Sequence, residues 1–392
     1  MIEPNKTYEG LNITYQVTED CNLRCSYCYE HHKRPADLSL DYANRFTKII
    51  LDDEDPIEVR GTENEWMLGK GLVMDFIGGD ALMRPKLVDD IMTYFQFYAG
   101  SIGHKWAYRW RMSISSNGTL FANPEVQDFI SKYIFNLSLG VSVDGCPDLH
   151  NLNRSNSFDA IEKGWPFYLD YCKKVNQNVG TKATFNKASI PYLSKSIKFM
   201  HEQMTMTHIN CNFIFEEMHL DEDDYILLES EMEKMVEYIL EHRNDLYVSM
   251  FDKGFGMGEP YGTTDIECGW CGAGSMPGVS VNGRIYPCFR FFPSTMVDEK
   301  FDFHVGDVWK GMYLKERFKI VREQSRKKVS PPMCKECTIE SACAWCIGGA
   351  FSETGTFWRQ TSLCRIKKMT DKWARIYWDN YKEKNYGSLQ RN

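Results

Sequence analysis

The sequence predicts an α/β protein in which a partial (β/α)6 barrel precedes a small cysteine-rich α+β domain and a C-terminal helix. Two observations support this fold class. Apolar segments typical of strands alternate with segments typical of helices over residues 11–215, a pattern that indicates a parallel sheet with right-handed crossovers. Eight of the 14 cysteines then lie within residues 268–364, where strands are short and turns are frequent. The change in composition marks a separate domain.

Six strands are expected in the barrel, at residues 11–17, 72–77, 111–115, 137–143, 181–185 and 209–215. Ser39 can cap a helix that runs to about Leu51, because serine accepts from the first free amides of a helix. A second helix is expected near residues 87–98, and Asn123-Pro124 supplies the cap and first position of a third. The acidic, polar residues 52–70 indicate a surface insertion.

The remaining boundaries follow from composition. The barrel takes residues 1–215, a bridging helical region takes 216–267, and the cysteine-rich domain takes 268–369. A long helix of mixed charge is expected over 221–243. Residues 370–392 form a C-terminal helix and tail, with an aromatic stripe that we expect to dock on the core, made of Trp373, Tyr377, Trp378 and Tyr381.

Charge and composition exclude several classes of protein. The net charge is -8 and the pI about 5.7, which disfavours nucleic-acid binding. The N-terminus has no apolar segment typical of a signal peptide, and no apolar run is long enough to span a membrane. We therefore expect a cytoplasmic protein, in which 14 cysteines indicate metal or redox chemistry rather than disulfides.

Cys21, Cys25 and Cys28 form a CxxxCxxC motif directly after the first predicted strand. Three thiolates on one loop can hold three irons of a [4Fe–4S] cluster and leave the fourth iron open for chemistry. A zinc loop and three buried thiols are the alternatives, but zinc usually takes four protein ligands. Because parallel barrels carry their chemistry at the carboxyl ends of strands, the polar residues that follow the next three strands should share this mouth.

The motif resembles the cluster loop of radical S-adenosylmethionine (SAM) enzymes. This resemblance implies that the three cysteines ligate a [4Fe–4S] cluster, that SAM occupies the open iron, and that Tyr27 packs against the adenine. Gly78-Gly79-Asp80 resembles the family's GGE motif, in which the acid accepts from the ammonium group of SAM; Asp80 is one methylene shorter than the usual Glu. The resemblance also implies SAM contacts for four further residues, which are Ser116, Asn117, Ser142 and Arg154.

The later cysteines resemble the SPASM domain of radical SAM peptide maturases, which carries two auxiliary [4Fe–4S] clusters. One cluster would use Cys268, Cys271, Cys288 and Cys346, and the other Cys334, Cys337, Cys343 and Cys364. Two residues separate Cys343 from Cys346 where three are usual, so the sequence leaves open which cluster Cys346 joins. Structural zinc sites are the alternative for these CxxC pairs.

The resemblance implies an enzyme that generates a 5′-deoxyadenosyl radical from SAM and abstracts hydrogen from a ribosomally made precursor peptide, leading to a thioether or carbon–carbon cross-link. Anaerobic sulfatase maturation to formylglycine is the alternative enzyme, but its Tyr-Pro-Cys-Asp base is replaced here by Tyr286-Pro287-Cys288-Phe289. A zinc-stapled binding protein is the non-enzyme alternative. The expected partners are the peptide and a flavodoxin or ferredoxin as electron donor. Because about ten residues precede the first strand, any recognition of a leader would use another surface of this chain or a separate leader-binding protein. No catalytic acid or base is assigned.

Overall fold

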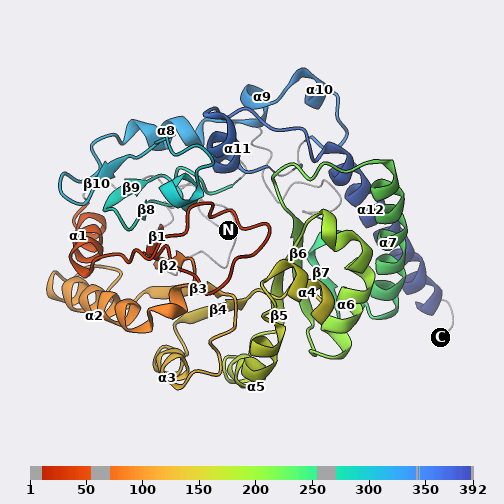
Figure 1. Ribbon diagram of the computed structural model, residues 1–392, viewed down its shortest axis with the longest axis horizontal. Helices are drawn as coiled ribbons and strands as arrows, with labels where there is room; N and C mark the ends of the chain where they lie inside the picture. Colours follow the sequence, from red (N-terminus) through yellow and green to blue (C-terminus); the bar gives the residue numbers. More distant parts are fainter. Residues whose placement is uncertain (1–10, 54–70, 254–270, 341–342, 344, 390–392) are drawn as a thin grey trace.

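The computed structural model describes residues 11–53, 71–253, 271–340, 343 and 345–389 (Figure 1). Four parallel strands stand side by side in chain order, as the sequence predicts: β1 (Leu11–Thr18), β2 (Leu72–Gly78), β3 (Trp110–Ser116) and β4 (Leu137–Val141). The described chain is thus α/β, and the strands with their outer helices form a partial barrel (Figure 1).

The backbone ladder of the barrel is interrupted after β4. The strands β5 (Gly180–Phe185), β6 (His208–Phe213) and β7 (Tyr247–Val248) form a second parallel sheet. The hydroxyl of Thr181 joins the two sheets, because it accepts from the amide of Val143 at 2.8 Å and lies 3.1 Å from the carbonyl of Val141. The six predicted strands are therefore all present, but a side chain replaces part of the expected ladder.

The first sheet continues on the other side of β1 with strands from the C-terminal part of the chain. β8 (Gly278–Val279) pairs parallel to β1 at Thr14 and Tyr15, and it forms a hairpin with β9 (Arg284–Tyr286). β10 (Gly306–Asp307) then pairs antiparallel to β9. The region expected as a separate cysteine-rich domain thus shares one sheet with the barrel.

Helices cover the outside of the strands (Figure 1). Ser39 caps α1 and Asn123 caps α3, as predicted, each accepting from a backbone amide of the first turn. These caps place the helix starts at the positions that sequence chemistry indicates. The helices of the barrel are α1 (Leu40–Leu51), α2 (Pro85–Ser101), α3 (Pro124–Lys132), α4 (Pro147–Asn153), α5 (Phe158–Lys174) and α6 (Leu193–Glu202).

Two long helices run side by side at one edge of the molecule, α7 (Glu222–Glu241) and α12 (Cys364–Leu389) (Figure 1). The predicted aromatic stripe of α12 does pack on the core: Trp373 and Tyr377 are buried, and the indole of Trp378 donates to the carbonyl of Phe251 at 2.8 Å. The helix begins at Cys364, six residues before the expected start at 370. The other helices of the C-terminal part are α8 (Glu316–Arg322), α9 (Arg326–Val329), α10 (Pro332–Lys335) and α11 (Ile347–Thr354).

The main hydrophobic core lies between the strands and their covering helices, and a smaller cluster around Phe291 and Phe292 underlies the cysteine-rich region. Among the described residues, no helix combines the length and the apolar character needed to cross a bilayer. The predicted insertion at 52–70 lies almost wholly outside the described residues, as does Cys268.

Candidate active site

The cluster loop begins where β1 ends. Cys21 is buried, while Cys25 and Cys28 are half-buried. The amide of Ser26 donates to the carbonyl of Asn153 at 2.9 Å, and the amide of Leu23 approaches the Cys21 sulfur at 3.4 Å. These bonds hold the loop against the end of α4, so three thiols are presented from one ordered turn.

The thiols lie close enough to influence one another. Burial raises the pKa of Cys21 and of Cys25, and in both cases the negative charge of Cys28 adds to this effect. For the ammonium of Lys33, burial lowers the pKa, but the neighbouring Cys28 and Cys21 thiolates outweigh it and raise the pKa overall. Three thiolates beside one cation are a donor set that fits an iron–sulfur cluster. Sequence reasoning missed Lys33, which no motif spacing marks.

Gly78 and Gly79 are required by a close approach of two backbones. A Cβ atom on Gly79 would lie 1.9 Å from the carbonyl oxygen of Asp20 and 2.7 Å from the Cβ of Cys21, and Gly78 has φ +145°. The Gly79 amide donates to the carbonyl of Thr18 at 2.9 Å. The two glycines thus let the end of β2 run directly against the start of the cluster loop.

Asp80 and the residues after β3 form one buried hydrogen-bond network. The Asp80 carboxylate accepts from the amide of Leu82 at 3.0 Å, the hydroxyl of Ser116 at 2.9 Å and the amide of Asn117 at 2.8 Å. Burial raises the pKa of Asp80, although these bonds oppose the rise. The Asn117 side-chain amide in turn donates to the carbonyl oxygen of Asn22 at 2.8 Å. Asp80, Ser116 and Asn117 are therefore brought together as predicted, but with their polar groups bonded to one another, and their contacts with SAM stay predictions.

Tyr27, Asp144 and Arg154 form a second network beside the loop. The Tyr27 hydroxyl donates to the Asp144 carboxylate, and the Arg154 guanidinium lies 3.0 Å from the same carboxylate and 5.4 Å from the centre of the Tyr27 ring. Burial lowers the pKa of Arg154, but the charges of Asp144, Tyr27 and Cys25 together raise the pKa overall. The predicted Arg154 and Tyr27 thus meet through Asp144. Ser142 is half-buried nearby on the chain, and its amide donates to the carbonyl of Ser116 at 2.9 Å.

Three of the later thiols lie together near the cluster loop. Burial raises the pKa of Cys271 to about 11 and raises that of Cys288, and in both cases the charge of Cys346 contributes. Cys346 therefore lies near Cys271 and Cys288, and the cluster that it would join stays a prediction. Cys268, the fourth expected member, lies outside the described residues.

The other later thiols line a cavity next to α12. Burial raises the pKa of Cys334 and Cys364, and the charge of Cys343 raises both further. The cavity is lined by Cys334, Cys337, Cys343 and Cys364, by Cys346 as well, and by the cationic side chains of Arg359 and Lys367. Four thiols next to cations suit an anionic cluster, and their ligation of iron stays a prediction. By contrast, Cys146, Cys172 and Cys211 are buried in the main core.

Comparison with known proteins agrees with this geometry. Residues 15–180 match the model of the Radical SAM superfamily. Residues 15–180 therefore form a radical SAM domain, and the chain is an enzyme with SAM and a [4Fe–4S] cluster as its cofactors. The thiols of the loop after β1 are the donor set that such a cluster requires. The match to an enzyme superfamily excludes the non-enzyme alternative, a zinc-stapled binding protein.

Relatives extend the likeness beyond this domain. The cysteine-type anaerobic sulfatase-maturating enzyme of Clostridium perfringens (strain 13 / Type A) is 24% identical over 364 residues, which cover 85% of this chain and 86% of that enzyme. An uncharacterized protein of Methanocaldococcus jannaschii is 23% identical over 195 residues, which cover 48% of this chain and 58% of that protein. The chain thus resembles the sulfatase-maturating enzyme along most of its length.

Two solved structures share the fold. Native anSMEcpe with bound AdoMet and Cp18Cys peptide has a TM-score of 0.69 and 17% identity, covering 95% of this chain and 99% of that chain. Streptococcus suis SuiB bound to its precursor peptide SuiA has a TM-score of 0.56 and 13% identity, covering 91% of this chain and 76% of that chain. Both likenesses show the radical SAM fold, with its parallel sheet and partial barrel.

Proposed function

We propose that this enzyme matures a ribosomally made precursor peptide and installs an oxidative cross-link, either a thioether or a carbon–carbon bond. The likeness to SuiB, which was solved with a precursor peptide, and to anSMEcpe, which was solved with a Cys-containing peptide, supports a peptide substrate. The observation that favours cross-linking over sulfatase maturation is the place of Phe289.

Phe289 lies beside the cluster loop. It follows Cys288 and opens a short 3-10 turn, and its ring centre is 5.9 Å from that of Tyr29, the residue after Cys28. The Arg290 guanidinium covers the same Tyr29 ring at 4.7 Å. Phe289 thus lies next to the residue that follows Cys28, which supports a position for residue 289 close to the reacting part of the substrate. The phenyl ring of Phe289 cannot accept a proton, whereas the corresponding Asp of sulfatase maturases serves as a base.

Sulfatase maturation is the second candidate, because the Clostridium perfringens enzyme is similar along 85% of this chain. That reaction oxidises a Cys or Ser side chain to an aldehyde and needs a base that takes the proton of the thiol or hydroxyl on the reacting carbon. This candidate thus requires an acceptor other than residue 289.

The chain's own residues would position and shield the reaction. When bound, SAM and the [4Fe–4S] cluster supply a 5′-deoxyadenosyl radical that abstracts hydrogen from the peptide. Tyr27, Asp144 and Arg154 hold the cluster loop in place from one side, and Gly79 lets β2 close it from the other. This rigid setting fixes where the substrate hydrogen must lie and limits the access of water.

We further propose that residues 268–369 hold two auxiliary [4Fe–4S] clusters. The thiols of Cys271, Cys288 and Cys346 form one group, and the cavity next to α12 holds the other. Such clusters can accept the electron that the substrate radical loses on cross-linking. A flavodoxin or ferredoxin would supply the first electron, and a separate protein would bind the leader of the peptide. Cytoplasmic location is part of the same proposal, since these clusters need reducing conditions.

The test uses anaerobically reconstituted enzyme, SAM and dithionite with two peptides in parallel. One is a Cys-containing peptide encoded beside the gene, and the other is a cysteine-type sulfatase peptide. Cross-linking predicts deoxyadenosine and a peptide mass lower by two hydrogen atoms, with no product that reacts with a hydrazide. An aldehyde on the sulfatase peptide would instead establish the second candidate.

Two variants separate the role of Phe289 from its packing. Phe289→Leu keeps an apolar side chain and should keep most of the cross-linking activity. Phe289→Asp should keep deoxyadenosine formation and lose cross-linking, since a charge would stand beside the buried Tyr29 ring. Equal cross-linking by the Asp variant would contradict a role for this position in substrate contact.

A further inference from the structure

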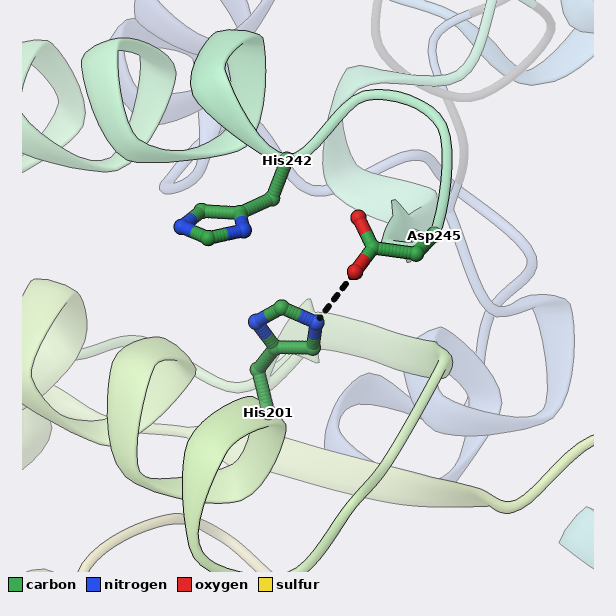
Figure 2. A group of neighbouring side chains, drawn as sticks. All are labelled: His201, His242 and Asp245. Carbon is green, nitrogen blue, oxygen red and sulfur yellow. Dashed lines mark ion pairs between the residues drawn. The ribbon is translucent and has the colours of Figure 1, made fainter.

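Two histidines and an aspartate meet far from the cluster loop. His201 lies in the last turn of α6, His242 follows the C-terminus of α7, and Asp245 stands in the turn that leads to β7. Figure 2 shows both imidazole rings and the carboxylate facing one another. One ligand atom from each residue lies within 4.8 Å of the other two.

The three groups already interact in pairs. Nε2 of His201 lies 3.4 Å from a carboxylate oxygen of Asp245 (Figure 2), and the two imidazole centres are 4.8 Å apart. The His201 side chain is 13% exposed and that of Asp245 is 61% exposed. The group is therefore anchored by a nearly buried histidine and opens to solvent on the carboxylate side, which leaves room for a water ligand.

The surroundings of His201 favour a cation at its Nε2. The phenol of Tyr238 lies 2.8 Å from Nδ1 of His201 and donates its proton to the carboxylate of Glu202 at 3.3 Å. When the phenol gives its proton to Glu202, Nδ1 of His201 carries the hydrogen that donates to the phenol oxygen.

This pattern leaves a lone pair on Nε2 of His201 that points at the carboxylate of Asp245. Two acceptors at 3.4 Å repel each other unless a positive charge lies between or beside them. A metal ion satisfies both, and metal-binding histidines commonly donate their other ring N–H to a fixed acceptor, as His201 does here to Tyr238.

We propose that His201, His242 and Asp245 bind one divalent transition-metal ion, with Zn²⁺ as the expected ion. Two imidazole nitrogens and one carboxylate oxygen, completed by water, are a set that Zn²⁺ takes readily. Ligand atoms around tetrahedral Zn²⁺ are about 3.3 Å apart, so the spacing of up to 4.8 Å must contract on binding. The exposed Asp245 carboxylate can supply most of this movement.

The place of the site in the fold indicates a structural role. His201 precedes β6, and Asp245 precedes β7, so both lie at the amino ends of these strands. The cluster loop lies at the carboxyl ends, about 20 Å away along a six-residue strand. The ion would tie the ends of α6 and α7 together and would take no part in the radical reaction.

The test loads the reconstituted, full-length holoenzyme with Zn²⁺ in the presence of a weak chelator. Zinc and iron per chain are measured by mass spectrometry after dialysis, and the zinc ligands by X-ray absorption at the zinc edge. We compare the wild type with His242→Gln, and with His219→Gln as the matched control, because His219 is 82% exposed and lies near Glu217.

The wild type and His219→Gln should hold one zinc with nitrogen and oxygen ligands, and His242→Gln should lose it while its iron content stays unchanged. Tyr238→Phe should weaken zinc binding by about tenfold, because His201 loses the acceptor that orients its ring. Equal zinc in all variants, or sulfur in the zinc spectrum, would place the metal at cysteines and overturn the proposal. Absence of bound zinc in the wild type would show a histidine–aspartate ion pair only, and would overturn it as well.

Discussion

The guanidinium of Arg154 lies 3.0 Å from the carboxylate of Asp144, and the two side chains are 8% and 0% exposed. Asp144 follows β4, Arg154 follows α4, and the Tyr27 hydroxyl of the cluster loop donates to the same carboxylate. Removal of one partner from a buried ion pair costs more stability than the intact pair contributes, because the remaining partner is left as an uncompensated buried charge. The position of the cluster loop therefore depends on Asp144 at the end of β4.

Replacement of Asp144 by Ala should lower the free energy of unfolding by about 3–5 kcal/mol, because Arg154 would stay buried without its partner. The measurement is the denaturant midpoint of the variant against that of the wild type. Asp148→Ala is the matched control, since Asp148 lies close by in the first turn of α4 and pairs with Lys195 at 2.6 Å in an exposed position. A loss no larger than that of the control would show that Arg154 finds another partner.

His150 should make stability depend on pH. Burial, with the charge of Arg154 in support, lowers the pKa of His150 to about 4, and Nε2 of its ring lies 3.0 Å from the Ser157 hydroxyl. The unfolded chain takes up this proton near pH 6.5, before the folded chain does. The contribution of His150 to the free energy of unfolding is therefore fully present above pH 6.5. It is lost as the pH falls toward 4, which lowers the free energy of unfolding by up to about 3 kcal/mol.

His150→Gln keeps a polar side chain that does not titrate in this range. The difference between the free energy of unfolding of His150→Gln and that of the wild type should change by about 3 kcal/mol between pH 7 and pH 4. His219→Gln, at an exposed position, should follow the wild type at every pH. Parallel curves for His150→Gln and the wild type would mean that the pKa of His150 does not change on folding.

The sequence predicts the strands of the barrel well, because each is a short apolar segment between polar turns. All six strands occur within a few residues of the expected ranges. It does not predict the break between β4 and β5, where the Thr181 hydroxyl joins the sheets. Nor does it predict the parallel pairing of β8 with β1, because a two-residue strand has no periodicity to read and its partner is fixed by packing.

The candidate site, like the fold, could be predicted from the sequence only in part. The CxxxCxxC motif and Gly78-Gly79 are local patterns, and the structure brings them together at the carboxyl ends of β1 and β2. The partners of Asp80 and Arg154 are separated from them by 36 and 10 residues, so they emerge only in the fold. Lys33 and the group of His201, His242 and Asp245 have no spacing that would single them out in the sequence.

Gly79→Ala should disable the cluster loop without unfolding the barrel. The new Cβ would lie 1.9 Å from the Asp20 carbonyl oxygen and 2.7 Å from the Cβ of Cys21, so the loop must move. A displacement of about 1 Å at reacting groups can cost about a hundredfold in rate, and we expect SAM cleavage to fall by that order. Gly100→Ala is the control, because its Cβ would meet no atom within 4 Å and alanine suits a helix. Normal SAM cleavage by Gly79→Ala would show that the loop can shift without loss.

The number of clusters can be tested with three single cysteine variants. Cys25→Ala should remove one cluster's iron and abolish SAM cleavage. Cys337→Ala should remove the iron of the cluster next to α12, keep deoxyadenosine formation, and lose the cross-linked product. Cys211→Ala is the control, because this thiol is buried in the main core and should leave iron content unchanged.

Iron and acid-labile sulfide per chain, read beside deoxyadenosine and peptide mass, separate these outcomes. Cys337→Ala removes one of the five thiols that line a single cavity with Arg359 and Lys367, so the other two thiol groups should keep their iron. If Cys337→Ala retains full iron content, this cavity holds no cluster, and the electron from the substrate must leave by the group of Cys271, Cys288 and Cys346. If Cys337→Ala loses SAM cleavage together with iron, the cavity supports the fold of the radical site itself. The assignment of separate roles to the two clusters would then be wrong.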